Sequence, residues 1–160
     1  GYQSMIVAAN GCRTPSSSET RKIRVRKDGG FRSDEHLYMN GIEVFNFAAT
    51  TVVKTIQDFM DEMNITDKQI DYLFLHQANK FMTDKIARKL KIPENKVPYS
   101  LEFFGNTSSA SIPLTITNLF SGLGSVSSKR CILSGFGNGL SWGVADVVLN
   151  NLYCPTLQEI

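Results

Sequence analysis

The chain has 160 residues, of which 42% are hydrophobic and 20% charged, and its formal net charge is +2. This composition is typical of one soluble globular domain that can bury a core. The charge balance excludes a strong basic excess, so we predict neither nucleic acid nor a membrane as a partner.

Targeting and redox features of the sequence are few. No apolar stretch approaches the roughly 20 residues that a membrane-spanning helix needs. The first residues, G-Y-Q-S-M-I-V-A-A-N-G, lack a basic segment followed by an apolar run, so we expect no signal peptide. Cys12, Cys131 and Cys154 are widely spaced and odd in number, which favours reduced thiols over a disulfide framework or a zinc site. We therefore expect a cytoplasmic protein that holds no metal.

The first forty residues, 1–40, form the least regular part of the chain. Residues 4–9 are compatible with a strand, and residues 14–19 form a turn-rich loop. Ile23 and Val25 alternate with basic residues, a pattern typical of a half-exposed strand. We interpret the charges here as a solvated face, with a functional basic patch as the alternative.

The pattern becomes helical from Gly41 onward. Apolar residues recur at spacings of three and four and predict one long helix with a buried face: Val44, Phe45, Ala48, Val52, Ile56, Phe59, Met60 and Met63. A buried strand follows at residues 71–75. A second helix is predicted over residues 79–90, with Lys85, Arg88 and Lys89 pointing outward.

The last third of the chain continues this alternation. Residues 106–120 predict a third helix, in which Pro113 must lie close to the first turn. A strand at 131–134, a glycine-rich turn at 135–139 and an apolar strand at 142–149 follow. Helices alternating with buried strands predict an α/β fold with helices packed on a largely buried sheet. We expect a core at about 41–150 and a tail at 151–160.

Three polar or glycine-rich junctions could carry chemistry. His76 follows a predicted strand at its carboxyl end, where α/β proteins place ligands, although an isolated histidine there can simply hold a loop. Asn106 precedes a predicted helix, where the plain alternative is a helix cap or a turn residue. The glycine cluster at 135–139 lets the backbone approach a ligand, or forms a tight hairpin turn. A strand follows it, so it is not a dinucleotide fingerprint.

Together these junctions carry a family resemblance. The matching motifs are M-N-G-I-E-V-F at 39–45, H-Q-A-N at 76–79, F-G-N-T-S-S-A-S-I-P-L at 104–114 and G-F-G-N-G-L-S-W-G at 135–143. They resemble the motifs of β-ketoacyl-acyl carrier protein synthase III, a thiolase-fold condensing enzyme, from about Gly29 to Leu149. The resemblance implies a thiolase-like fold, with helices layered on a mixed sheet, of which this chain is the C-terminal half.

The resemblance also implies a reaction. The family condenses acyl-CoA with malonyl-acyl carrier protein, with loss of carbon dioxide, to start fatty-acid or related acyl chain synthesis, and uses no cofactor beyond these substrates. His76 and Asn106 match the histidine and asparagine that donate hydrogen bonds to the enolate oxygen. The backbone of Gly137 and Asn138 matches the oxyanion hole, although the family often has glycine where this chain has Asn138.

A further set of residues matches the segment that borders the docking surface for acyl carrier protein and coenzyme A: Gln77, Ala78, Asn79, Lys80 and Phe81. Some members carry arginine at the position of Phe81, and some carry lysine at the position of Asn46. Arg88 and Lys89 keep the helix basic and are the better candidates for contacting an acidic carrier protein.

The resemblance leaves the nucleophile unassigned. The family's cysteine lies in the N-terminal half, at the start of a buried helix, and none of Cys12, Cys131 and Cys154 fits that position. We therefore expect a fragment of a roughly double-length, homodimeric enzyme that is inactive alone. Two alternatives remain: a relative that transfers acyl groups to an alcohol or amine without decarboxylation, and a non-catalytic module that binds carrier protein.

Overall fold

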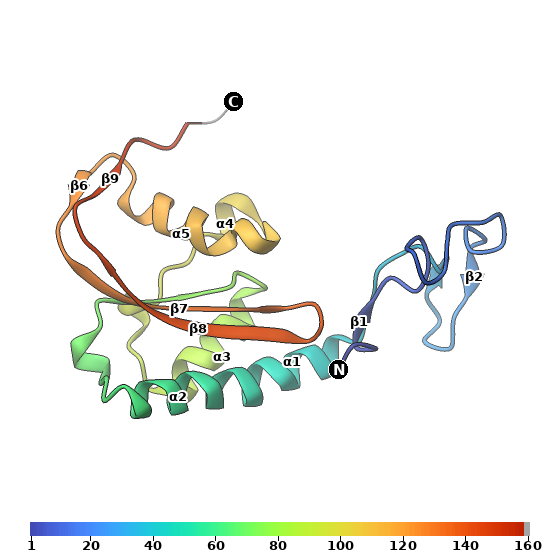
Figure 1. Ribbon diagram of the computed structural model, residues 1–160, viewed down its shortest axis with the longest axis horizontal. Helices are drawn as coiled ribbons and strands as arrows, with labels where there is room; N and C mark the ends of the chain where they lie inside the picture. The colour runs from blue at the N-terminus through green and yellow to red at the C-terminus, as the bar shows by residue number, and fades with distance from the viewer. Residues whose placement is uncertain (159–160) are drawn as a thin grey trace. The chain divides into compact units, whose positions relative to one another are not determined.

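The computed structural model describes residues 1–158 of the chain. These residues form two compact units, and Figure 1 traces both from the N-terminus in blue to the C-terminus in red. The first unit contains Gly1–Val44 and Gly137–Ser141. The second unit contains Phe45–Phe136 and the chain from Trp142 onward.

The first unit contains two short strand pairs within largely irregular chain. β1 (Met5–Ile6) pairs antiparallel with β4 (Tyr38–Met39), and β2 (Arg24–Val25) pairs antiparallel with β3 (Phe31–Arg32). The strand predicted around residue 24 is present as a two-residue strand, and of the strand predicted at 4–9 only Met5–Ile6 forms. Val25 opposes Phe31 in the second pair, and both side chains are largely exposed, at 66% and 74%. The apolar side chains Ile23 and Val25 are thus the exposed ones, whereas Arg24 and Arg26 are half-buried and form ion pairs with Asp34. The expectation that the charges form the solvated face is therefore wrong for this strand.

A long helical segment follows, as the apolar spacing predicts. It consists of α1 (Gly41–Phe47), a π-helical turn η1 (Ala48–Val52) and α2 (Val53–Glu62). The buried side chains confirm the predicted stripe, with Met63 as the exception: it lies beyond α2 and is 52% exposed. The π turn interrupts the regular hydrogen-bond ladder, and Lys89 donates a hydrogen bond from Nζ to the carbonyl oxygen of Ala49 at 2.7 Å.

The sheet of the second unit is mixed and has the order β5–β7–β8. β5 (Tyr72–Leu75) runs parallel to β7 (Lys129–Gly137), with Leu73 opposite Ile132. β8 (Ser141–Leu149) follows β7 after three residues, a connection that only antiparallel strands allow. The central side chains of β5 and Ile132 are fully buried, because helices cover both faces of the sheet.

Helices lie on both sides of this sheet. Figure 1 shows α2 and α3 (Lys80–Leu90) on one side of the β7–β8 ribbon, and α4 (Leu101–Phe104) and α5 (Ser111–Phe120) on the other. Three 3₁₀ turns connect these elements: η2 (Asp67–Gln69), η3 (Glu94–Lys96) and η4 (Ser108–Ala110). Helices layered on a mixed sheet confirm the predicted α/β fold.

Three details differ from the expectations. The helix predicted over 106–120 begins at Ser111, because η4 occupies 108–110, and this places Pro113 in the first turn where its missing N–H costs nothing. The glycine turn predicted at 135–139 is shorter, since β7 extends to Gly137. A strand pair of β6 (Gly124–Val126) and β9 (Leu152–Cys154) lies partly in the stretch expected to be a tail.

No helix in residues 1–158 is long and apolar enough to cross a membrane.

Candidate active site

His76 lies at the carboxyl end of β5, as the sequence predicts. Its backbone N–H donates a hydrogen bond to the carbonyl oxygen of Ser134 at 3.0 Å, which extends the pairing of β5 with β7 by one residue. The imidazole ring is half-buried and meets the ring of Phe136 edge to face, with 5.4 Å between centroids and an interplanar angle of 90°. The imidazole therefore packs between the end of β5 and the ring of Phe136.

Two serines contact the imidazole: Ser108 in η4 and Ser111, the first residue of α5. The Nδ1 atom of His76 lies 2.7 Å from the hydroxyl oxygen of Ser111, which also accepts the N–H of Gln77 at 3.3 Å. Burial lowers the pKa of His76, and a hydrogen bond with the backbone of Ser108 opposes part of that effect. Burial disfavours the charged ring, so the site holds a neutral imidazole that can donate from one ring nitrogen and accept at the other.

Asn106 lies at the start of the segment that reaches His76. Its side chain is exposed, and its Oδ1 atom accepts the N–H of Ser108 at 2.9 Å. Asn106 therefore forms a local turn and does not cap α5, whose cap residue is Ala110. With the side-chain oxygen engaged, the amide nitrogen has no partner in the described part of the chain and remains a donor.

Ser108 adopts an unusual backbone conformation beside the imidazole. Its φ is +53°, in the left-handed region that residues other than glycine seldom occupy. Such a conformation costs about 1–2 kcal/mol and persists where the surrounding structure holds it in place. It turns the chain between Asn106 and Ser111 so that one short segment reaches the histidine through two serines.

The residues directly after His76 have structural tasks. The side chain of Gln77 is 1% exposed; its amide donates to the carbonyl oxygen of Leu75 at 2.9 Å and accepts the N–H of Ser100 at 3.2 Å. Gln77 therefore offers no side-chain surface to a partner. Ala78 is half-buried, and Asn79 caps α3 by accepting the N–H of Met82 at 2.8 Å. These bonds hold the loop that carries the imidazole.

α3 presents the remaining residues of the expected docking surface. Phe81 is 68% exposed and stacks on Phe45, with ring centroids 5.4 Å apart and an interplanar angle of 16°. The guanidinium of Arg88 lies 3.9 Å from a carboxylate oxygen of Asp84. The ammonium group of Lys89 donates a hydrogen bond to the π-turn carbonyl of Ala49.

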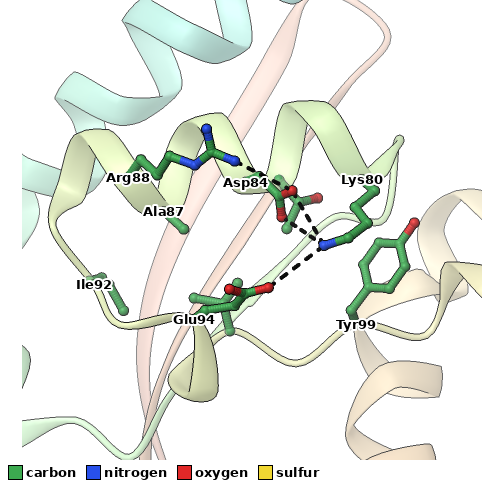
Figure 2. Close-up of a pocket in the computed structure, with 9 residues that line it drawn as sticks. Lys80, Asp84, Ala87, Arg88, Ile92, Glu94 and Tyr99 are labelled. Carbon is green, nitrogen blue, oxygen red and sulfur yellow. Dashed lines mark hydrogen bonds and ion pairs between the residues drawn. The ribbon is translucent and has the colours of Figure 1, made fainter.

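A pocket of about 130 Å³ lies beside the same helix (Figure 2). Four charged side chains on its rim neutralise one another: the Nζ atom of Lys80 lies 3.1 Å from Asp84 and 3.8 Å from Glu94, and Arg88 faces Asp84. Lys80 also lies 5.2 Å from the ring centroid of Tyr99. The pocket therefore offers a ligand no net charge.

The residues expected to form an oxyanion hole lie at the β7–β8 connection. Gly137 ends β7, and Asn138 opens the three-residue turn. Asn138 is not among the described residues with a positive φ, so its side chain imposes no strain of that kind. Gly139 has a φ of +133°, and a Cβ atom there would lie 2.9 Å from the backbone nitrogen of Ser141. The backbone therefore requires glycine at position 139, and not at position 138, where the family often has glycine and this chain has Asn138.

None of the three cysteines in the described residues has the environment of a reactive nucleophile. Cys131 lies within β7 and is fully buried, and burial raises the pKa of its thiol to about 12, with the charge of Asp71 contributing. Cys154 is buried in β9, while Cys12 is exposed in an irregular segment. Residues 1–158 contain no group of three histidine, cysteine or acidic side chains placed to hold a metal ion.

The sequence motifs point to His76 and Asn106 but not to the residues that orient them. Ser111 and Phe136 both contact the imidazole, and both lie inside the quoted motifs at 104–114 and 135–143. Their presence in those motifs is the one feature of the sequence that points to a role for Ser111 and Phe136. A serine 35 positions from the histidine gives no local pattern that predicts the contact.

Comparison with known proteins identifies the family to which this chain belongs. Residues 60–148 match the sequence profile of a family described as "3-Oxoacyl-[acyl-carrier-protein (ACP)] synthase III C terminal". The chain is 42% identical over 112 residues to β-ketoacyl-[acyl-carrier-protein] synthase III of Streptococcus agalactiae, which covers 69% of this chain and 35% of that protein. The same enzyme of Streptococcus pneumoniae is 43% identical over 113 residues, with the same coverage.

Solved structures give the same result for the fold. A crystal structure of a 3-oxoacyl-(acyl-carrier-protein) synthase III matches with a TM-score of 0.83 and 36% identity, covering 94% of this chain and 44% of that one. The enzyme from Burkholderia xenovorans matches with a TM-score of 0.82 and 32% identity, covering 98% and 44%. The chain thus has the thiolase-like fold of the C-terminal half of these proteins, and its match spans about a third of the length of the curated relatives.

Proposed function

Because this chain belongs to the 3-oxoacyl-[acyl-carrier-protein] synthase III family, whose C-terminal domain it matches, we propose that it supplies the decarboxylating part of a condensing enzyme. In this proposal His76 and Asn106 act together on a malonyl thioester. The observation that carries it is the oriented, neutral imidazole of His76, which contacts the segment that begins at Asn106.

The proposed chemistry begins with loss of carbon dioxide from malonyl-acyl carrier protein. The bond between the carboxylate carbon and the α-carbon breaks, and its electron pair moves into the thioester as an enolate. His76 and Asn106 donate hydrogen bonds to the enolate oxygen, where negative charge develops. Each well-placed donor of this kind contributes on the order of 10²–10³ in rate.

Carbon–carbon bond formation completes the proposed cycle. The enolate carbon attacks the carbonyl carbon of an acyl group that acyl-CoA has loaded onto a cysteine. The new carbon–carbon bond forms, the carbon–sulfur bond breaks, and the cysteine leaves as a thiolate. That cysteine is expected in the other half of the enzyme, since Cys131 is buried with a raised pKa and Cys154 is buried as well.

The tautomer of His76 follows from its neighbours. Since the hydroxyl oxygen of Ser111 receives the N–H of Gln77, the hydroxyl proton is free to be donated to Nδ1. A neutral ring that accepts at Nδ1 carries its own proton on Nε2. Nε2 is therefore the atom that we assign as the donor to the enolate, and Ser111 is a positioning residue.

Two further roles belong to the proposal. The backbone N–H of Asn138, with Gly137 beside it, is expected to stabilise the oxyanion of the acyl-enzyme. The outer face of α3 is expected to receive the carrier protein, and the complete enzyme is expected to form a homodimer. Light scattering on the full-length protein tests the dimer, and substitution of Asn138 by proline, which removes the N–H, tests the oxyanion role by loss of acyl loading.

The deciding experiment measures two products with the full-length enzyme. Carbon dioxide release from malonyl-acyl carrier protein reports decarboxylation, and mass spectrometry of the intact protein after exposure to acyl-CoA reports cysteine loading. Both are expected. Loading without carbon dioxide release, together with acyl transfer to an alcohol or amine, would instead support a non-decarboxylating acyltransferase. Absence of both would leave only a carrier-binding module.

The 160-residue chain alone is expected to catalyse no condensation. Mass spectrometry after incubation with acyl-CoA should detect no acylated cysteine, because the loading cysteine is expected in the other half. A thioester on Cys12, Cys131 or Cys154 formed at a catalytic rate would contradict this expectation.

A further inference from the structure

An aromatic pair stands on the surface at the start of α3. Phe81 is 68% exposed, and its ring stacks on the half-buried ring of Phe45 with centroids 5.4 Å apart. A single exposed apolar side chain is ordinary, but here a second ring supports the first and fixes its orientation. A rigid aromatic side chain that gains burial on contact is a typical anchor of protein interfaces.

Cations share one face of the helix with this ring. Lys85, Arg88 and Lys89 follow Phe81 at intervals of four, seven and eight residues, so the four side chains form one stripe along α3. The opposite face is buried and includes Met82 and Ile86. We call the four exposed residues the α3 stripe.

The charge of the α3 stripe is only partly compensated. Arg88 lies 3.9 Å from Asp84, and Lys89 bonds a backbone carbonyl, which leaves its charge unneutralised. Lys85 forms no ion pair within the described part of the chain. An aromatic anchor with a positive surface behind it complements an acidic partner that presents an apolar side chain among its carboxylates.

The position of the ring relative to His76 indicates what such a partner would do. Phe81 follows His76 by five residues, so the two Cα atoms lie within about 18 Å of each other. A protein seated on the ring would thus hold a thioester on a flexible arm within reach of the imidazole. This step rests on the proposed function.

We propose that the Phe45–Phe81 pair anchors an acidic acyl carrier protein through an apolar contact, so that docking depends on aromatic burial as well as on charge. The cations of the α3 stripe steer the carrier protein and set its on-rate, and the ring slows its dissociation. Docking should therefore persist when salt screens the cations.

The test measures the dissociation constant of a carrier protein without an acyl group for the full-length enzyme, by fluorescence anisotropy. Phe81→Ala should raise this constant about tenfold, because it removes most of the apolar contact area. Phe103→Ala is the matched control, since Phe103 is equally exposed at 68% on α4. Its constant should stay within about twofold of wild type, and Phe81→Tyr, which keeps the ring, should do the same.

Ionic strength separates the apolar contact from the charges. Raising it from about 0.1 M to about 1 M shortens the Debye length from about 10 Å to about 3 Å. The ratio between Phe81→Ala and wild type should remain near tenfold, whereas the ratio between Lys85→Gln and wild type should fall toward one. A Phe81→Ala ratio that also falls to one, or that is one at low salt, would overturn the proposal.

The outcomes for docking and for catalysis remain distinguishable. Phe81-dependent binding without carbon dioxide release would support the docking surface and reject the proposed reaction. Carbon dioxide release with unaltered binding by Phe81→Ala would reject the aromatic anchor and leave the reaction in place. A wild-type enzyme that binds no carrier protein would also overturn the anchor.

Discussion

The imidazole Nδ1 atom of His76 lies 2.7 Å from the hydroxyl oxygen of Ser111, a residue 35 positions further along the chain. This contact joins the end of β5 to the first residue of α5. Because Ser111 is 2% exposed and its oxygen also receives the N–H of Gln77, the hydroxyl proton can hardly be donated to water. With Ser111 as the donor to Nδ1, as we propose, Nε2 is the protonated ring nitrogen that faces a substrate.

Replacement of His76 by alanine in the full-length enzyme should separate the two halves of the reaction. Carbon dioxide release should fall about 10²–10³-fold, because a donor to the enolate oxygen is lost. Acyl loading should remain near the wild-type rate, since it depends on the cysteine. The control is His36→Ala, which changes the chain's other histidine. Equal loss of release and loading would contradict the role assigned to His76.

Replacement of Ser111 by alanine tests positioning. The imidazole loses the hydroxyl that fixes its tautomer, so carbon dioxide release should fall about tenfold, the size expected for one lost hydrogen bond. Nitrogen NMR of the histidine ring should show a shift from the tautomer protonated at Nε2 toward a mixture. Ser109→Ala, in the same segment but exposed, should leave both measurements unchanged. A lower rate with an unaltered tautomer would assign Ser111 a purely structural role.

The pH dependence of decarboxylation should reflect the burial of His76. Burial disfavours the imidazolium and lowers the pKa, so the neutral donor persists to lower pH than for a histidine in water. As the pH falls through the lowered pKa the ring becomes charged, and the rate should decline only there. A pH–rate profile of carbon dioxide release, checked by proton NMR of the ring, measures this. An acid limb above pH about 6.5, the ordinary histidine value, would contradict it.

Local sequence patterns predicted most of the helices and strands and the two main site residues. Apolar spacing predicted the helices around Ile56 and Ile86, because burial on one face leaves a periodic pattern. The run before His76 predicted β5, because burial on both faces leaves a continuous apolar run. His76 and Asn106 were found because each belongs to a motif at an element junction. Their positions followed from where those elements end.

The parts that the sequence did not predict depend on tertiary contacts. The π turn at Ala48–Val52 lies within the apolar spacing that predicts one continuous helix, and the ammonium group of Lys89, from another helix, bonds one of its carbonyls. β9 forms by pairing with β6, which begins 28 residues earlier. The role of Ser111 has no local sequence signal for the same reason, since it depends on His76 on another element.

Thiol reactivity should distinguish the buried cysteines from the exposed one. The pKa of Cys131 is raised to about 12, so only a minute fraction is thiolate at neutral pH, and the side chain is fully buried. Iodoacetamide followed by peptide mass spectrometry should modify Cys12 at least about 100-fold faster than Cys131 under native conditions. In urea the two rates should converge. Rapid native modification of Cys131 would contradict its placement within β7.

Gln77 should contribute to stability through the two hydrogen bonds of its buried amide. Gln77→Leu keeps the approximate volume but leaves the N–H of Ser100 and the carbonyl of Leu75 without their partner in a buried site. Each unsatisfied group costs about 1–3 kcal/mol, so the free energy of unfolding should fall by about 2–6 kcal/mol in urea titrations of the full-length protein. Gln57→Leu is the control, because Gln57 is exposed and bonds only Asp61 on its own helix; its effect should stay within about 0.5 kcal/mol. Gln77→Leu keeps the backbone N–H that donates to Ser111, so carbon dioxide release should decline only as far as the loop behind His76 loses stability. A Gln77→Leu protein as stable as Gln57→Leu would show that neither hydrogen bond holds the segment behind His76.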